Sequence, residues 1–232
     1  MRVVAWNCCG GFIRKLPALE ALRPDIAVIS ETRQADLHIG GDSLSTAWIG
    51  SPDGGKGLAI LGFNGWNVTP VMVCSEKWYL PVHVVRGEQR LKMLGVWTLP
   101  ARDYVTPTLR ALDELSEFLA DGSVVCGGDF NQNTIWDNGK SIPRRFAGAL
   151  QRLDSLGLKN IWHEQHNEEH GRESAATHFH RWSPENRYHI DYLFASADIR
   201  IRTKSMDMGS YSDWVAAKIS DHVPIVAEFF PE

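Results

Sequence analysis

The sequence has no apolar run long enough to cross a bilayer, which takes about 20 consecutive apolar residues. Its longest aliphatic runs are as short as IAVI at 26–29. The opening residues, MRVVAWNCCGG, also lack an apolar stretch of signal-peptide length. We therefore expect no membrane association and a cytoplasmic location.

Cysteine is scarce and shows no paired spacing. Of the four cysteines, Cys8 and Cys9 are adjacent, and Cys74 and Cys126 lie inside apolar runs. The sequence contains neither a CxxC motif nor the regular cysteine spacing of a secreted disulfide framework. We expect buried free thiols in a reducing compartment.

An excess of positive charge is also missing. Lys and Arg number 24 against 28 Asp and Glu, which gives a net charge of −4. A protein that coats nucleic acid broadly is usually basic, so this class is excluded. A phosphate substrate is not excluded, because a bound divalent cation can supply positive charge locally.

No Pro, Gly and Ser-rich linker and no fixed-period repeat divides the 232 residues, so a single domain over 1–232 is expected. Apolar runs rich in β-branched residues, bounded by turn-forming residues, predict strands at 2–6, 25–30, 57–63, 68–74, 80–85, 91–97, 123–128, 189–196 and 223–230. Helical spacing of apolar residues predicts helices over 15–22, from 107 to Gly122, and from 143 to Gly157. This order favours an α/β protein of mixed sheets covered by helices.

Polar residues interrupt the predicted strand ends in five separate segments. They are Asn7, Glu31, the pair Asp129 and Asn131, Asp191, and the pair Asp221 and His222. A charge in or beside a buried strand is costly unless it is paired or metal-bound. Each position has a structural alternative: turn formation for Asn7 and GGDFN, a surface or helix-start role for Glu31, a buried salt bridge for Asp191, and a strand cap for Asp221 and His222.

These segments form a known combination of motifs in a fixed order between residues 4 and 229: AWN, PDIAVISET, GGDFN, IDYLFAS and SDHVPIVAEF. The chain resembles the endonuclease/exonuclease/phosphatase superfamily, which includes DNase I, apurinic endonucleases, inositol-polyphosphate 5-phosphatases and neutral sphingomyelinases. The resemblance implies a four-layer α/β sandwich of two mixed β-sheets flanked by helices. It also implies a site at one end of the sheets.

The resemblance further implies a metal site. Glu31 would be the main ligand of Mg²⁺, or of Mn²⁺, with Asn7 close to the metal or the phosphate and Asp221 as a further ligand. Oxygen ligands suit such hard cations. Two positions depart from the family pattern: Ser30 stands where Gln is frequent, and Cys9 replaces a frequent acidic or polar residue, which weakens any second metal site.

The resemblance also implies four catalytic residues, which act as two pairs. Asp129 would orient and deprotonate the attacking water, while Asn131 donates a hydrogen bond to the phosphate or positions Asp129. His222, oriented by Asp191, would contact the phosphate as a cation or exchange a proton. A neighbouring carboxylate raises the pKa of a histidine, which favours the charged form. Which group acts as general base stays open.

Candidate substrate contacts are less well defined. The family often has His or Tyr beside the phosphate where this chain has Trp97 or Thr98, and His189 replaces an Arg before IDY. The segment ATHFHRW aligns loosely with a family segment beside the site and makes His178 a candidate. Arg144 could reach a flanking phosphate, or simply lie on a solvated helix face.

Five of the nine histidines lie within residues 161–182. On a helix, His163, His166 and His170 would share one face, an arrangement that permits a Zn²⁺ site. No cysteine accompanies them, and the segment also has the composition of a solvated loop that carries substrate specificity. We expect the solvated loop.

The sequence thus predicts a divalent-metal-dependent phosphodiester hydrolase, an endonuclease or exonuclease that cleaves DNA or RNA by attack of an activated water on phosphorus. The alternative is a phosphoesterase for a small-molecule or lipid-like phosphate. A catalytically silent binding module is disfavoured, because all the implied catalytic groups and the Glu31 ligand are present. Nucleic acid is the expected partner, and no obligate protein partner is indicated.

Overall fold

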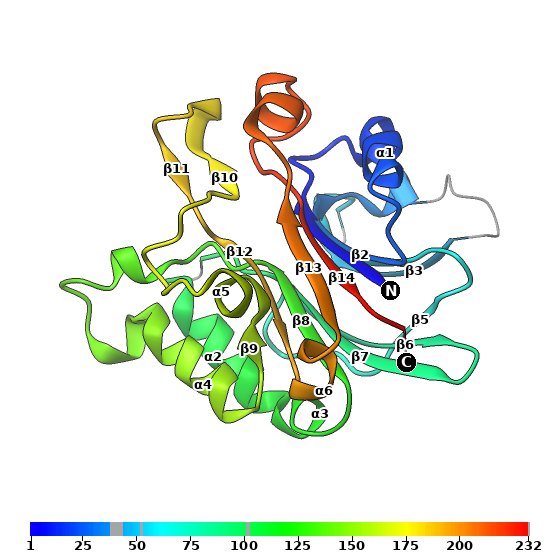
Figure 1. The fold of residues 1–232 in the computed structure, drawn as a ribbon, viewed down its shortest axis with the longest axis horizontal. Helices are drawn as coiled ribbons and strands as arrows, with labels where there is room; N and C mark the ends of the chain where they lie inside the picture. Colours follow the sequence, from blue (N-terminus) through cyan, green and yellow to red (C-terminus); the bar gives the residue numbers. More distant parts are fainter. Residues whose placement is uncertain (38–43, 52, 101–102, 232) are drawn as a thin grey trace.

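The computed structural model describes residues 1–37, 44–51, 53–100 and 103–231. Two six-stranded β-sheets pack face to face, and helices lie on their outer faces (Figure 1). Within the described residues, no helix combines the length and apolar character that a bilayer crossing requires. The arrangement confirms the expected sandwich of two mixed sheets flanked by helices.

The first sheet contains both ends of the chain. Its strands β1 and β2 are parallel, and its other neighbouring strands are antiparallel. In spatial order the strands are β13 (Thr203–Met208), β14 (Ile225–Phe229), β1 (Arg2–Asn7), β2 (Ile26–Thr32), β4 (Gly57–Gly62) and β3 (Ser45–Gly50).

The second sheet repeats this plan, with one parallel pair, β7 and β8, among antiparallel neighbours. Its spatial order is β5 (Asn67–Pro70), β6 (Tyr79–Arg86), β7 (Gln89–Trp97), β8 (Val124–Asp129), β12 (Asp191–Ala195) and β9 (Lys159–Asn160). A separate hairpin of β10 (His178–Phe179) and β11 (Arg187–Tyr188) stands beyond the ends of both sheets, yellow in Figure 1.

The main core lies between the two sheets. Val28 and Ile60 of the first sheet, and Val82, Met93 and Leu193 of the second, are fully buried in one cluster. Burial of such side chains is worth about 1.5–3 kcal/mol each, so this interface supplies much of the drive for folding. It also fixes the two sheets relative to each other, end to end.

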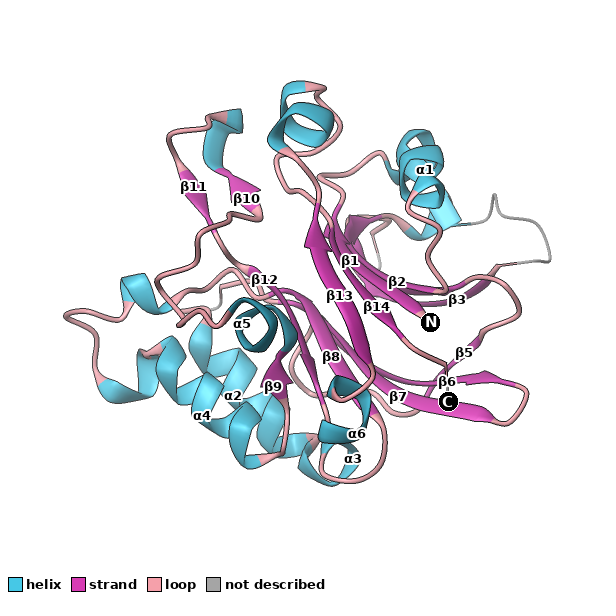
Figure 2. Cartoon of the chain, in the orientation of Figure 1, coloured by secondary structure: helices cyan, strands magenta, loops and turns pink. Residues whose placement is uncertain are grey.

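The outer layers consist of helices. On the first sheet lies α1 (Phe12–Ala21), and on the second lie α2 (Val105–Glu114), α3 (Ser116–Leu119) and α4 (Phe146–Ser155), as Figure 2 shows. Two shorter helices are α5 (Ile161–His166) and α6 (Ala197–Arg200). Short 3-10 helices span Gln34–Leu37, Thr134–Trp136, Ile142–Arg144 and His180–Trp182, and a π-helical turn spans Tyr211–Ala216.

Two helix starts differ from the predicted ones because carboxylates cap them. The backbone N–H groups of Val105 and Thr106 donate to Asp103 at 2.9 and 2.6 Å, so α2 begins at Val105 instead of at 107. The N–H of Phe146 donates to Asp137 at 2.7 Å, and α4 begins there instead of at 143. Acidic caps satisfy the free N–H groups of a helix start.

Two strands of the first sheet were not predicted from the sequence. Strands β3 and β13 lie at its two edges and are mostly half-exposed, so neither forms an apolar run. The predicted strand 68–74 is shortened to β5. All four cysteines are free thiols, and Cys8, Cys74 and Cys126 are buried, whereas Cys9 is only partly buried.

Candidate functional site

The predicted polar residues meet at one end of the sandwich. Asn7 ends β1 and Glu31 lies near the end of β2, in the first sheet. In the second sheet Asp129 ends β8, and Asp191 is its direct cross-strand partner at the start of β12. His222 forms an isolated bridge with His178 of the β10–β11 hairpin. The two sheets therefore supply the site jointly.

Glu31 sits at a break in the strand register. The pairing of β2 with β4 shifts between Ser30 and Thr32, and Glu31 has a φ of 63°. Such a conformation costs a non-glycine residue about 1–3 kcal/mol, and bulges of this kind re-aim a side chain. The Glu31 carboxylate accepts a hydrogen bond from Asn7 Nδ2 at 3.1 Å and forms an ion pair with Lys56.

Asp129 is 1 % exposed and is held by three N–H donors. Its Oδ2 accepts from Asn7 Nδ2 at 2.9 Å and from Asn131 Nδ2 at 3.0 Å. Its Oδ1 accepts from the Asn131 backbone N–H at 2.9 Å. Asn131 Nδ2 also donates to the carbonyl of Thr98 at 3.1 Å. Asn131 thus orients Asp129.

The two glycines of GGDFN allow neighbouring strands to pack closely, and they do not form the turn that the sequence suggests. Gly127 and Gly128 lie inside β8, and the chain turns only at Asn131, whose φ is 50°. A Cβ on Gly128 would stand 2.0 Å from the Val96 carbonyl oxygen, and one on Gly127 would stand 2.3 Å from Leu193 Cδ2. Neighbouring strands approach here more closely than a side chain allows.

Asp191 and His222 form a buried pair. Asp191 Oδ2 lies 2.9 Å from His222 Nδ1, and the side chains are 0 % and 7 % exposed. Burial alone would lower the pKa of His222, but the Asp191 carboxylate raises it to about 10. His222 is therefore a cation at neutral pH.

The charges around Asp129 make it a weak acid. Burial and the negative charge of Asp191 raise the pKa of Asp129 to about 7, although His222 and the Asn7 hydrogen bond act in the opposite direction. A group with a pKa near the working pH is suited to accept and release a proton. Asp129 thus has the properties of a general base.

The donor set fits a hard divalent cation. The Glu31 carboxylate forms an ion pair with the Lys56 ammonium, so a positive charge is stabilised beside it. The carboxylates of Asp129 and Asp191 lie in one buried group, and Asp191 Oδ1 has no hydrogen-bond partner among the described residues. Carboxylate and amide oxygens are preferred by Mg²⁺ and Mn²⁺.

Asp221 and His178 lie beside this set. Asp221 Oδ2 is 3.8 Å from His178 Nε2, and the Asp221 carboxylate adds to the effect of burial in raising the pKa of Cys9. The His178 and His222 rings are 4.4 Å apart. Burial and the charge of His222 lower the pKa of His178 to about 3, so it is neutral. The two predicted carboxylate ligands thus have different neighbours. Asp221 lies against His178, whereas Glu31 contacts Asn7 and Lys56.

Two predicted substrate contacts, Trp97 and Arg144, differ in exposure. Trp97 is buried in the core between the sheets, and its ring lies 5.0 Å from that of Trp78. The carbonyl of its neighbour Thr98 instead orients Asn131. Arg144 is 58 % exposed and lies 3.8 Å from Asp103, as expected of a solvated helix residue.

A cavity of about 740 Å³ opens beside Asn131 and His178. Aromatic and apolar side chains line much of it, with Lys140 as a basic residue. The rings of Trp136 and Tyr188 are 5.0 Å apart on its wall. Such a cavity suits a ligand with a flat ring next to a phosphate.

Asn133 is a site residue that the sequence did not reveal. It is 1 % exposed, and its Oδ1 accepts from the Ile135 N–H at 3.0 Å. Its Nδ2 lies within donor distance of the His189 carbonyl at 2.9 Å, of Tyr192 Oη at 3.1 Å, and of Glu173 at 3.2 Å. Asn133 thereby anchors the loop that follows Asp129. The sequence signal for this role is the position of Asn133, four residues after Asp129.

We expect Asn133→Ala to lower the free energy of unfolding by about 1–3 kcal/mol, because buried acceptors lose their donor. Urea denaturation followed by circular dichroism measures the change. Asn138→Ala makes the same chemical change on the partly exposed part of the loop and should have a smaller effect. Equal losses for both variants would contradict the anchoring role.

The fold and the site together define a class: a DNase I-like α/β sandwich with a polar site where the ends of its two sheets meet. The chain belongs to the endonuclease/exonuclease/phosphatase family, whose model matches residues 4–222. The proteins of this class are hydrolytic nucleases and phosphoesterases. No curated protein sequence matches the chain.

Solved structures share the fold over the whole chain. An AP endonuclease from Archaeoglobus fulgidus is 18% identical, with a TM-score of 0.75 and all of both chains covered. A 3'-5' exonuclease from Neisseria meningitidis is 20% identical, with a TM-score of 0.72 and 99% of each chain covered. A truncated TDP2 from Caenorhabditis elegans is 15% identical, with a TM-score of 0.71, and covers 99% of this chain and 97% of its own.

Proposed function

We propose that the chain is a divalent-metal-dependent phosphodiester hydrolase that cleaves DNA or RNA. The observation that carries the proposal is the buried Asp129, held by Asn7 and Asn131 directly opposite the Asp191–His222 pair. One carboxylate with a pKa of about 7 and one histidine cation stand side by side. This pairing suits a reaction that takes a proton from water and stabilises negative charge on phosphate.

In the proposed reaction Asp129 accepts a proton from a water molecule, whose oxygen then attacks phosphorus. His222 donates a hydrogen bond to a phosphate oxygen through Nε2, since its Nδ1 is engaged by Asp191. Asp191 keeps the imidazole oriented and charged. Asn131 holds the Asp129 carboxylate still. The P–O bond to the leaving group breaks, and the leaving oxygen takes up a proton, so one water is consumed.

Glu31 and Asn7 would hold the divalent cation, Mg²⁺ or Mn²⁺, with Asp221 as a candidate further ligand. A cation bound there neutralises phosphate charge and polarises the P–O bond. Lys56 would have to leave Glu31 when the cation binds, because its ammonium occupies one carboxylate oxygen. Its long side chain would then be available to a phosphate oxygen.

Two observations support nucleic acid as the substrate. The cavity beside Asn131 and His178 has two aromatic side chains on its wall, Trp136 and Tyr188, that would accept a base. Among the structural neighbours are an AP endonuclease and a 3' phosphatase of Neisseria bound to a product DNA hairpin. A small or lipid-like phosphate ester is the second candidate, because the same cavity has the volume of a small-ligand pocket.

The test is cleavage of plasmid DNA, single-stranded DNA, RNA and a generic bis-phosphodiester with Mg²⁺, Mn²⁺ or EDTA. We expect cleavage of a nucleic acid with either metal, complete loss in EDTA, and recovery when metal is restored. Cleavage of the bis-phosphodiester alone would favour the small-ester alternative. Activity that survives EDTA would overturn the metal-dependent proposal.

Glu31→Gln tests the proposed ligand directly. The amide keeps the shape of the side chain but loses its charge. The metal concentration for half-maximal activity should therefore rise at least about tenfold, because loss of even a supporting contact lowers metal affinity by about that factor. Glu20→Gln, an equivalent change at an exposed residue of helix α1, should leave this concentration unchanged. An unchanged metal requirement in Glu31→Gln would remove Glu31 from the metal site.

A further inference from the structure

The histidine-rich segment forms a buried cluster that the proposed reaction does not use. Residues Ile161–His166 form helix α5, so the solvated loop expected from the sequence was wrong there. His163 and His170 lie together, their ring centroids 3.7 Å apart. His166 instead packs against Trp162, with the two rings tilted by 31°. The third member of the cluster is Glu173.

The spacing of the three side chains matches a metal site. Glu173 Oε1 lies 3.1 Å from His163 Nε2 and 3.8 Å from His170 Nδ1. One ligand atom from each residue lies within 4.8 Å of the other two. Ligand atoms around a tetrahedral Zn²⁺ are about 3.4 Å apart, given bonds of about 2.0–2.1 Å.

The cluster also contains buried nitrogens that lack partners. His163 is 8 % exposed, and its Nδ1 has no hydrogen-bond partner among the described residues. The same holds for His170 Nδ1, the atom nearest Glu173. Leaving a buried polar atom unpaired costs free energy, so such atoms call for a ligand or another explanation.

Hydrogen-bond donors of neighbouring residues hold the Glu173 carboxylate in place. The Gly171 N–H lies 3.0 Å from both of its oxygens. Asn133 Nδ2 lies 3.2 Å from both oxygens and also fixes the orientation of the carboxylate. Supporting contacts of this kind raise metal affinity.

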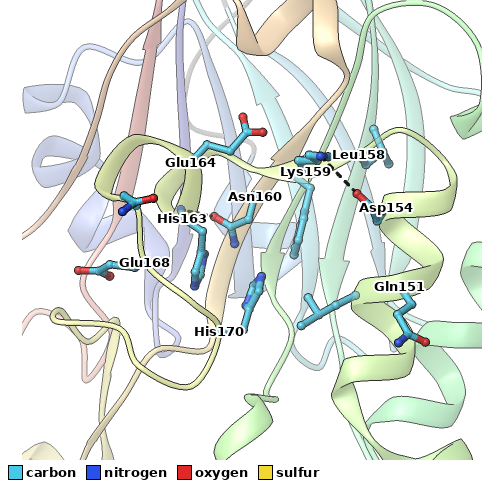
Figure 3. Close-up of a pocket in the computed structure, with 12 residues that line it drawn as sticks. Gln151, Asp154, Leu158, Lys159, Asn160, His163, Glu164, Glu168 and His170 are labelled. Carbon is cyan, nitrogen blue, oxygen red and sulfur yellow. Dashed lines mark hydrogen bonds and ion pairs between the residues drawn. The ribbon is translucent and has the colours of Figure 1, made fainter.

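A cavity of about 610 Å³ gives an ion access to the cluster. His163 and His170 both line it, between helices α5 and α4, as Figure 3 shows. Asp154, Glu164 and Glu168 also line it, and Lys159 and Arg200 form ion pairs with the first two. Water in the cavity could complete the coordination of a bound ion.

We propose that His163, His170 and Glu173 form a binding site for a divalent transition metal ion of the Zn²⁺ type, separate from the catalytic metal. Two imidazoles and one carboxylate favour Zn²⁺, Co²⁺ or Ni²⁺ over Mg²⁺. The lone pair of an imidazole lies in the ring plane, and the two rings are only 22° from parallel. Binding therefore turns the His170 ring out of the stack toward the cavity, where 21 % of its side chain is exposed.

The test is binding of Co²⁺ and Zn²⁺ to the whole protein with excess Mg²⁺, which competes for the catalytic site. We expect one Co²⁺ with visible absorption bands that Zn²⁺ displaces. His170→Phe keeps a ring against Phe194 and removes the nitrogen, and should weaken binding at least about tenfold. His166→Phe, on the same segment, should bind like the wild type. Glu31→Gln should also keep the bands, because Glu31 belongs to the catalytic metal site.

Several results would overturn the proposal. They are unchanged affinity in a folded His170→Phe variant, unchanged affinity in Glu173→Gln, or loss of the Co²⁺ bands in Glu31→Gln. A measurement without variants covers the case of misfolding: ring ¹⁵N resonances of wild-type His163 and His170 should shift on Zn²⁺ addition while those of His166 stay. Unshifted His163 and His170 resonances would also contradict the site. These outcomes do not depend on the proposed hydrolase activity.

Discussion

Asp129→Asn should reduce the single-turnover rate of substrate cleavage by about 10³-fold, within the range that general-base catalysis contributes. The amide has the shape of the carboxylate but cannot take a proton from water. Its NH₂ group would also face donors, because Asn7 and Asn131 both donate to Asp129. Binding of the substrate should change much less than the rate.

Single-turnover measurements with labelled oligonucleotide separate the chemical step from product release. Asp154→Asn is a matched control, because it makes the same substitution at an exposed residue, which pairs with Lys159 at 3.8 Å. This control should cleave at the wild-type rate. A decrease of less than tenfold in Asp129→Asn would mean that another group deprotonates the water.

Gly128→Ala should prevent stable folding, with a loss above about 4 kcal/mol, a range reached only by severe structural conflicts. Gly128 has a φ of 138°, and a Cβ there would stand 2.0 Å from the backbone oxygen of Val96. Strands β7 and β8 pair in parallel at the centre of the second sheet, so neither can shift without disturbing its neighbours. The methyl group thus conflicts with the sheet itself.

Urea denaturation, or the soluble yield if the variant does not fold, measures this effect. Gly139→Ala is the control: its φ is also positive, at 75°, but no heavy atom lies within 4 Å of an added Cβ. It should lose only about 1–2 kcal/mol, the cost of a left-handed conformation. Similar losses at the two positions would show that backbone conformation, and not close strand approach, decides the outcome.

The sequence predicted the strands that form the interior, because they are continuous apolar runs. It also predicted which polar residues interrupt them: charges such as Glu31 and Asp191 are too costly in a core to occur without partners. Strand order and the pairing of Asp129 with Asp191 could not be obtained from local patterns. These depend on contacts between distant segments, and the resemblance to a family supplied only the sandwich of two mixed sheets and the position of the site at one end of them.

Other features depend on single contacts that leave no local pattern. The helix caps Asp103 and Asp137 act across turns, so the predicted helix starts were displaced. Lys56 lies in a glycine-rich loop, and nothing in that loop indicates an ion pair with Glu31. A continuous helix would have placed His163, His166 and His170 on one face. Glu173 lies beside His163 and His170 instead of His166, because the chain turns after α5 at Asn167, whose φ is 53°.

The division of the site between two sheets ties its geometry to the core. Asn7 and Glu31 come from the first sheet, and Asp129 and Asp191 come from the second. The hydrogen bond from Asn7 to Asp129 therefore crosses from one sheet to the other. Because protein interiors transmit strain, substitutions in the buried layer between the sheets would alter the arrangement of the site without touching any of its residues.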